Sequence, residues 1–313
     1  MQVTCHKPGQ RVYSNHMKSK IIVIAGQTAT GKSDLGVELA REFNGEVVSA
    51  DSRQVYRGLD LGSGKITVEE MKGVPHHMLD VMDPKHTYSV ALYKKEALKV
   101  IEDILSRGKL PIVVGGTGQY IEAIVDNPIF PEVSPNHQLR EILDKMETED
   151  LYSLLKDKDT RRSGEIDQKN RPRLIRALEI YDALGNIPEA SKGEGLFEPL
   201  QIGLKIEKAK LIERIQKRLD NRLEKEMVKE VEDLQKNGLS WKRLESLGLE
   251  YQQIAEYLQE KKDFEEMKRV LAIKIRQFSK RQVTWFQKDK RIKWFEPGQD
   301  KEVFEVVKKF LEN

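Results

Sequence analysis

The sequence predicts an α/β protein with a doubly wound parallel sheet of the phosphate-loop (P-loop) type, a helical insertion and a helical C-terminal region. Two observations carry this prediction. Four short apolar runs alternate with segments of helical periodicity, which is typical of parallel sheets. Directly after the first run, residues 26–33 match the pattern G-x-x-x-x-G-K-[S/T] in full.

The four apolar runs are the predicted strands, at residues 20–25, 46–50, 108–114 and 200–206. Residues 138–197 carry charged helical patterns without a convincing strand, so we expect a helical insertion there. The core domain then consists of 20–137 and 198–313, with helices at its C-terminal end. Residues 1–19 lack apolar periodicity and are expected to be a disordered leader.

Composition narrows the class of protein. A length of 313 residues provides ample material for a core, and a net charge of +3 is too small to prove an anionic partner. The single cysteine, Cys5, excludes internal disulfides and cysteine-based zinc sites, which fits a reducing cytosol. No apolar stretch approaches the length of a membrane span. We therefore expect a cytoplasmic protein without a membrane partner, and a monomer.

The phosphate loop predicts a diphosphate site. Its glycines let backbone N–H groups face phosphate oxygens, Lys32 adds a positive charge, and the Ser33 hydroxyl can ligate Mg²⁺ at a helix N-terminus. The pattern does not name the ligand, because nucleotides and other diphosphates present the same oxygens. The predicted diphosphate-binding residues are Gly26, Gln27, Thr28, Ala29, Thr30, Gly31, Lys32 and Ser33.

Two further loops should face the same crevice. Asp51 follows the second predicted strand and Thr117 follows the third, and ligands of open α/β sheets bind outside the carboxyl ends of the strands. An aspartate over a diphosphate can act as a general base or hold a metal through water. Thr117 can hydrogen-bond the bridging oxygen of a leaving diphosphate. These roles predict displacement of diphosphate by a deprotonated nucleophile.

Two basic patterns in the C-terminal third have open interpretations. Arg214, Arg218 and Arg222 form an i, i+4 ladder, and such a ladder is more often a solvated face than a site. Residues 274–286 mix cations with Phe278 and Trp285, which suits RNA phosphates and unpaired bases. It equally suits rings in the core with cations in water.

Together these segments resemble the tRNA dimethylallyltransferases, also called isopentenyltransferases. The resemblance covers nearly the whole chain after residue 19. It rests on residues 26–33, 51–62, 74–80, 83–84, 88–89, 111–118, 173–181 and 280–286. It implies transfer of a dimethylallyl group from dimethylallyl diphosphate to the exocyclic N6 amine of the adenosine 3′ of the anticodon, in tRNAs reading codons that begin with U.

The resemblance also implies roles for individual residues. Asp51, Thr117 and Arg218 are the expected catalytic residues, with Arg214 as the alternative for the last, and Mg²⁺ on Ser33 is the expected cofactor. The expected tRNA-binding residues are Asp51, Ser52, Arg53, Gln54, Arg140, Arg173, Arg176, Lys280 and Arg281. Gln27 stands where the family usually has proline, and residues 248–251 differ from its common glycine-tyrosine form.

Two rival functions remain open from the sequence. An isopentenyltransferase acting on free adenine nucleotides, as in cytokinin synthesis, would not need Arg173 and Arg176. A nucleotide-dependent RNA-binding ATPase would bind ATP at the loop and would need neither Asp51 nor Thr117 for turnover. The adjacent His76 and His77 suggest a metal site, but neighbouring side chains on an extended segment point apart, which favours structural roles.

Overall fold

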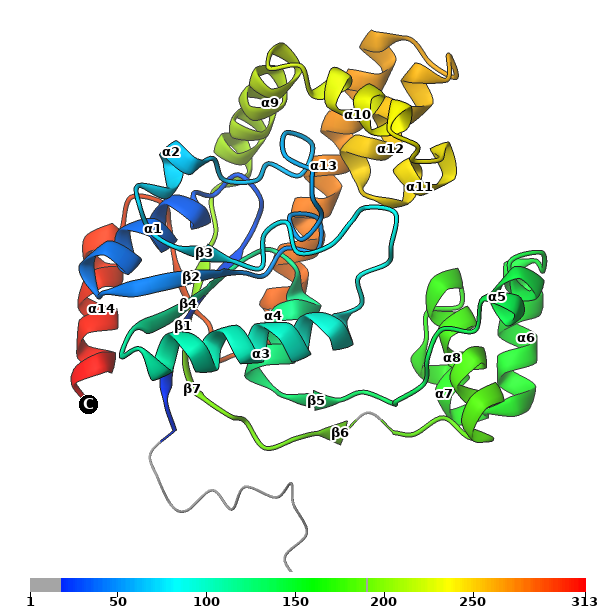
Figure 1. The fold of residues 1–313 in the computed structure, drawn as a ribbon, viewed down its shortest axis with the longest axis horizontal. Coiled ribbons are helices and arrows are strands. Elements are labelled where there is room, and N and C mark those ends of the chain that lie inside the picture. Colours follow the sequence, from blue (N-terminus) through cyan, green and yellow to red (C-terminus); the bar gives the residue numbers. More distant parts are fainter. Residues whose placement is uncertain (1–17, 190) are drawn as a thin grey trace, which may run out of the picture. The chain divides into compact units, whose positions relative to one another are not determined.

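The structure, a computed structural model, describes residues 18–189 and 191–313, which fall into two compact units (Figure 1). Unit 1 contains the described chain up to Asp126 together with Gly195–Asn313, and unit 2 is Asn127–Glu194. The division thus differs from the expected insertion at 138–197. Most of the expected leader, residues 1–17, lies outside the described residues. Ser19, the last residue of that leader, instead continues the sheet, because its carbonyl oxygen accepts a hydrogen bond from Glu198 N at 2.9 Å.

Unit 1 is built on a six-stranded sheet in the order β3-β2-β4-β1-β7-β8. All of its strand pairs are parallel, which confirms the predicted fold class. The four predicted strands form the centre of the sheet, and the two edge strands, β3 and β8, were not predicted. The strands are β1 Lys20–Gly26, β2 Gly45–Ser49, β3 His76–His77, β4 Leu110–Val114, β7 Glu198–Leu204 and β8 Lys293–Phe295.

Helices cover both faces of this sheet. Alternate residues of β1 point to opposite faces. Ile22 and Ile24 belong to a hydrophobic cluster with residues of α1 and α14, while Ile21 and Val23 join a second cluster with residues of α3, α4 and α13. The helices before and after unit 2 are α1 Lys32–Glu42, α2 Val68–Met71, α3 Val90–Ser106, α4 Gly118–Val125, α9 Lys208–Glu224, α10 Met227–Lys236, α11 Trp241–Ser246, α12 Leu249–Leu258, α13 Phe264–Phe286 and α14 Asp300–Glu312.

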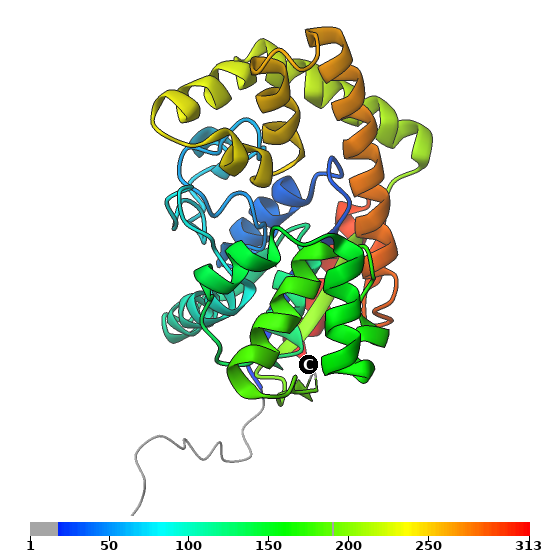
Figure 2. The same cartoon turned by 90° about the vertical axis from the view of Figure 1, so that its right-hand side faces the viewer.

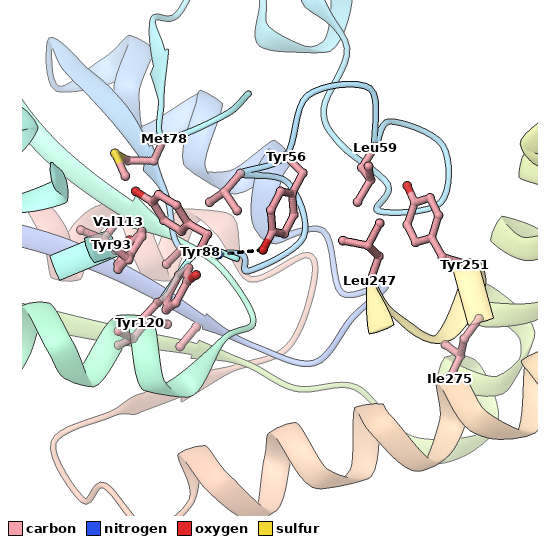
Figure 3. Packing of buried hydrophobic residues seen from close by; sticks show 14 of the residues in the cluster. Tyr56, Leu59, Met78, Tyr88, Tyr93, Val113, Tyr120, Leu247, Tyr251 and Ile275 are labelled. Atoms are coloured by element: carbon pink, nitrogen blue, oxygen red, sulfur yellow. Dashed lines mark hydrogen bonds between the residues drawn. The ribbon is translucent and has the colours of Figure 1, made fainter. Parts of the chain in front are cut away.

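Tyrosines fix the segments that carry the predicted catalytic residues (Figure 3). The rings of Tyr93 in α3 and Tyr120 in α4 stack with centroids 3.8 Å apart. The Tyr93 hydroxyl donates to the carbonyl oxygen of Ser49, the last residue of β2, at 3.0 Å. The Tyr56 hydroxyl accepts from Tyr88 N at 3.0 Å. The end of β2 and the first turn of α4 are therefore tied to one buried cluster.

The edge strand β3 explains the adjacent histidines. His76 Nδ1 lies 2.9 Å from the Val74 carbonyl oxygen, and His77 Nε2 lies 2.7 Å from a carboxylate oxygen of buried Glu46. Arg107 and Lys109 also bind Glu46, and the hydrogen bonds from Arg107 hold the pKa of this carboxyl well below its usual range. The described residues contain no group of three or more His, Cys, Asp or Glu able to hold a metal ion. Both histidines thus have hydrogen-bonding partners within unit 1.

The long helix α13, drawn in orange in Figure 2, contacts both the C-terminal helices and the sheet of unit 1. It packs against α9 and α12, and also against α4 and β1.

Unit 2 has its own hydrophobic core around Leu151, Leu155 and Leu174. Its elements are β5 Pro128–Ile129, α5 His137–Leu143, α6 Thr148–Lys158, α7 Thr160–Glu165, α8 Arg171–Leu184 and β6 Ser191–Lys192. Strands β5 and β6 pair antiparallel. Among the helices of both units, none in the described parts of the chain has the length and apolar character of a membrane span.

Candidate active site at the phosphate loop

The phosphate loop connects β1 to α1 through backbone conformations that favour glycine. Gly26 has φ 142°, and a side chain there would place Cβ 2.3 Å from the Leu204 carbonyl oxygen. Gly31, the N-cap of α1, is left-handed with φ 85°. The first N–H groups of a helix lack intrahelical partners, so the start of α1 offers donors to an anion. The geometry fits the predicted cradle.

Two cations converge at this cradle. The Lys32 ammonium donates to the Gln27 carbonyl oxygen, and Arg218 Nη2 donates to the Gly64 carbonyl oxygen at 3.2 Å. Burial, assisted by the neighbouring Arg218, lowers the pKa of Lys32 to about 7, although Asp51 opposes the shift. Burial and the adjacent Arg222 lower the pKa of Arg218 to about 10. A bound anion would relieve both shifts.

Asp51 and Thr117 lie on loops that follow the neighbouring strands β2 and β4. Asp51 Oδ1 accepts from Arg53 N at 2.8 Å, and within the described chain Oδ2 accepts no hydrogen bond. The Thr117 hydroxyl oxygen accepts from Ser52 N at 3.0 Å and lies 3.3 Å from Ser52 Oγ. The structure thus brings Asp51, Ser52 and Thr117 together, with one carboxylate oxygen free to accept a proton.

Gln282 of α13 joins the phosphate loop to the loop after β4. Its side-chain oxygen accepts from Thr28 N at 2.8 Å, and its amide nitrogen donates to the Gly116 carbonyl oxygen at 3.0 Å. A side chain at Gly116 would place Cβ 2.3 Å from that nitrogen. Sequence reasoning assigned no role to Gln282, although it lies in the segment 280–286 that carried part of the family resemblance.

A cavity opens beside the phosphate loop, and two of the three arginines of α9 line it. Arg218 and Arg222 line it, whereas Arg214 is exposed. The expectation of a solvated ladder is therefore wrong for Arg218 and Arg222, because the apolar face of α9 turns them inward with Ile215 and Leu219. The cavity is lined by Thr28, Ala29, Ile215, Arg218, Leu219, Arg222, Glu250 and Ile275.

The loop that follows Asp51 is held by contacts within unit 1. Ser52, Arg53 and Gln54 are half-buried. Arg53 Nη1 donates to the Ser246 carbonyl oxygen at 3.5 Å, and the Gln54 amide donates to the Gly64 carbonyl oxygen at 3.3 Å. Gly64 O therefore accepts from both Gln54 and Arg218, which connects the expected base-binding loop to the expected diphosphate-binding arginine.

In unit 2, two of the three predicted tRNA-binding arginines surround a buried carboxylate. Glu179 is 1% exposed. Arg140 donates to it twice at 2.8 Å, and Arg176 donates to it and to the Val133 carbonyl oxygen. Burial alone would raise the pKa of Glu179, but the hydrogen bonds from Arg140 and Arg176 hold it at about 2. Arg173, in contrast, is exposed.

The basic and aromatic segment of α13 has one aromatic ring on its surface and one packed inside, so each of the two interpretations holds for part of it. Lys280 and Arg281 are exposed, and the Arg281 guanidinium lies 5.8 Å from the centroid of the Phe278 ring, which is 39% exposed. Trp285 instead packs against Gly118, where a Cβ would lie 2.3 Å from its indole nitrogen. The segment thus presents cations and one ring on its surface and uses the other ring for packing.

The site suits Mg²⁺ only together with a ligand. Ser33 is exposed in the first turn of α1. Mg²⁺ prefers oxygen ligands and is usually held by one or two protein groups plus substrate phosphates. The Ser33 hydroxyl and the oxygens of a bound diphosphate make such a donor set. When bound, the ion would neutralise charge on the diphosphate.

The fold and this site define the protein as a P-loop enzyme of the α/β class with a carboxylate beside its anion cradle. Residues 54–289 match the sequence model of the IPP transferase family. The chain belongs to the family of tRNA dimethylallyltransferases, which are prenyltransferases.

Named relatives support this membership. The chain is 41% identical to a tRNA dimethylallyltransferase of Pelotomaculum thermopropionicum over 90% of its own length and 92% of the relative's. It is similar to the crystal structure of the tRNA isopentenylpyrophosphate transferase of Bacillus halodurans, with a TM-score of 0.70, 34% identity and coverage of 94% and 96%. A eukaryotic dimethylallyltransferase acting on tRNA has a TM-score of 0.73 at 27% identity, with coverage of 89% of this chain and 74% of that one.

Proposed function

We propose that this enzyme transfers a dimethylallyl group from dimethylallyl diphosphate to the exocyclic N6 amine of the adenosine 3′ of the anticodon, in tRNAs reading codons that begin with U, and releases diphosphate. The observation that carries the proposal is the free Oδ2 of Asp51, which lies within electrostatic range of two cations at the phosphate loop, Lys32 and Arg218. A proton acceptor and a leaving-group site thereby share one crevice.

The donor would bind through its diphosphate. The first N–H groups of α1, Lys32 and Arg218 supply positive charge to phosphate oxygens. The apolar side chains of Ile215, Leu219 and Ile275 line the adjoining cavity and suit a short isoprenoid chain better than a ribose. The lowered pKa values of both cations indicate that the ligand-free site is electrostatically unfavourable and favours an anion.

The transfer step then needs three groups. The amine nitrogen attacks the allylic carbon with its lone pair, and the carbon–oxygen bond to diphosphate breaks with its electron pair leaving on oxygen. Asp51 Oδ2 accepts the amine proton as the new bond forms, because an amine conjugated to a purine is a weak nucleophile. Thr117 would donate to the departing oxygen once its hydroxyl turns away from Ser52, which lies 3.3 Å away.

The acceptor would reach Asp51 as an extruded base. An adenosine stacked in an anticodon loop hides its amine, so the base has to leave the stack before it can react. Exposed cations, namely Arg173 in unit 2 and Lys280 and Arg281 in α13, would bind tRNA phosphates. Arg140 and Arg176 would serve tRNA binding by shaping unit 2 around Glu179.

Substituting Asp51 tests this function. In Asp51→Asn, turnover with radiolabelled dimethylallyl diphosphate and unmodified tRNA should fall by roughly 10²- to 10⁴-fold, since general-base catalysis contributes that much. Affinities for tRNA and for pyrophosphate should stay close to wild type. Asp233→Asn, which changes an exposed aspartate of α10, is the matched control and should behave as wild type.

The same assay discriminates the acceptors. Free AMP in place of tRNA should receive no label. Labelled AMP, or turnover of Asp51→Asn within threefold of wild type, would refute the proposed function.

A further inference from the structure

The cavity beside the phosphate loop contains an ion pair that the proposed transfer step does not use. Arg222 Nη1 of α9 lies 3.4 Å from Glu250 Oε1 of α12, and the two side chains are 12% and 19% exposed. Both residues line the cavity together with Thr28 and Ala29 of the phosphate loop. Exposed ion pairs are strongly screened by water, whereas a pair in a cavity wall changes the potential that a ligand meets.

Glu250 compensates for two arginines that lie side by side. Both guanidinium groups press on the backbone of Gly64, where a Cβ would lie 2.2 Å from Arg218 Nη2 and 1.7 Å from Arg222 Nη2. Only glycine at this position lets both arginines reach the cavity. Arg222 repels Arg218, and Glu250 offsets that repulsion. Glu250 therefore lowers the positive potential that an anion meets in the cavity, although burial raises the pKa of this carboxyl.

One backbone donor at the cavity is already occupied. Thr28 lines the cavity, and its N–H is already bonded to the side-chain oxygen of Gln282 at 2.8 Å. A diphosphate can rest on the later N–H groups at the start of α1 and on Lys32. A longer phosphate chain that enters the cavity would meet the Glu250 carboxylate and find the Thr28 N–H already occupied.

We propose that the Arg222–Glu250 pair is a specificity element that makes this site select diphosphates over triphosphates. A third phosphate adds negative charge and requires further donors. Glu250 cancels the arginine that would attract this charge, and Gln282 occupies the donor that would bind it. The inference rests on the proposed function, because it explains how a P-loop site would take an isoprenoid diphosphate in preference to a triphosphate.

Calorimetry with two probes, pyrophosphate and tripolyphosphate, each with Mg²⁺, tests the proposal without any prenyl transfer. The quantity of interest is the ratio of the tripolyphosphate Kd to the pyrophosphate Kd. The ratio should exceed one in the wild type. In Glu250→Gln, which keeps the side-chain shape, it should fall about tenfold, a change of about 1.4 kcal/mol.

Two further variants keep the outcome interpretable. Arg222→Gln combined with Glu250→Gln restores the original net charge, so the ratio should return toward the wild-type value, whereas a purely structural role predicts no return. Glu256→Gln is the matched control, because Glu256 lies on α12 like Glu250 but outside the cavity. It forms an ion pair with Lys262, and the two side chains have a similar exposure, 22% and 13%. Its ratio should equal that of the wild type.

The proposal is overturned if Glu250→Gln leaves the ratio within twofold of the wild type, or if the wild type binds tripolyphosphate as tightly as pyrophosphate. Thermal melting of each variant confirms that it folds. Failure of the proposed function is a separate outcome, since it would appear as absent prenyl transfer by the wild type, whichever phosphate chain the site prefers.

Discussion

Around the phosphate loop of unit 1, Lys32 and Arg218 donate to backbone carbonyl oxygens, whereas in unit 2 Arg140 and Arg176 surround the carboxylate of Glu179. The pKa values reflect the difference. Burial lowers those of Lys32 and Arg218, and the nearby carboxylates of Asp51 and Glu250 offset these shifts only in part. In unit 2, the two arginines keep the pKa of Glu179 at about 2.

The comparison separates two uses of the same residue types. A buried cation without a full counter-charge is costly until an anion arrives, so that part of the molecule favours binding at the expense of stability. A buried carboxylate with two arginines is already satisfied, and it becomes costly only when one partner is removed. We therefore infer that Lys32 and Arg218 serve a ligand, whereas the Arg140, Arg176 and Glu179 cluster serves the fold.

The largest expected effect follows from removing the carboxylate in unit 2. Glu179→Gln leaves Arg140 and Arg176 without their counter-ion and should lower the free energy of unfolding by about 3–5 kcal/mol, measured by urea denaturation. Glu165→Gln is the control, because Glu165 is 47% exposed and its pairs with Arg161 and Arg162 should contribute less than about 1 kcal/mol. Equal losses in both variants would contradict the comparison.

The pH dependence of stability checks the same carboxylate. The pKa of Glu179 in the folded protein, about 2, lies below its unfolded value. Its stabilising contribution is therefore fully present above about pH 4.5 and is lost as the pH falls toward 2. Glu179→Gln should flatten the stability profile in this window.

An effect of intermediate size is expected at the phosphate loop, where a substitution should weaken ligand binding without lowering stability. Lys32→Met removes a poorly compensated cation, so the unfolding free energy should not decrease. Pyrophosphate affinity should fall about 10- to 100-fold, from the roughly 1.5–3 kcal/mol of a charge-assisted hydrogen bond. A loss of stability like that of Glu179→Gln would remove the distinction between the two units.

The lowered pKa of Lys32 also predicts that the protein takes up protons when pyrophosphate binds. Its pKa is about 7 in the free protein, and a bound anion raises it. Affinity for pyrophosphate should therefore weaken as the pH rises above 7, and calorimetry in buffers of different ionisation enthalpy should show protons taken up. Lys32→Arg keeps a charged side chain at every pH used and should lack this part of the uptake.

The smallest effect is expected at the surface of unit 2. Arg173 is exposed and forms no ion pair within the described residues, so Arg173→Ala should weaken tRNA binding by about 1 kcal/mol, roughly fivefold, and should reduce the salt slope by about one. Arg162→Ala, which removes a cation already paired with Glu165, should leave the salt slope unchanged. An unaltered slope in Arg173→Ala would refute its contact with phosphate.

Much of the fold could be predicted because its signals are local. The central strands are continuous apolar runs buried on both faces, and the phosphate loop is a contiguous pattern. The edge strands escaped prediction because His76–His77 and Lys293–Phe295 are short and carry polar residues. They are strands because an already formed neighbour supplies their hydrogen bonds.

Only part of the candidate site could be predicted from the sequence. Asp51 and Thr117 follow from the rule that the carboxyl ends of parallel strands share one edge, and the structure joins their loops through Ser52. Gln282 carries no local signal, since it acts through Thr28 and Gly116, which are distant in the chain. Helical spacing described the arginine ladder, but it did not reveal which side of α9 faces the cavity.

The sequence by itself determined the parallel α/β sheet, the phosphate cradle and the family, because each depends on residues that are neighbours in the chain or on a repeating period. Only the tertiary structure decided which charges are compensated. Arg176 pairs with Glu179 within helix α8, and Arg140 of α5 pairs with the same carboxylate. Arg222 of α9 pairs with Glu250 of a different helix, α12. Electrostatic energy depends on distance in space, and the spacing of charges along a chain does not contain that distance.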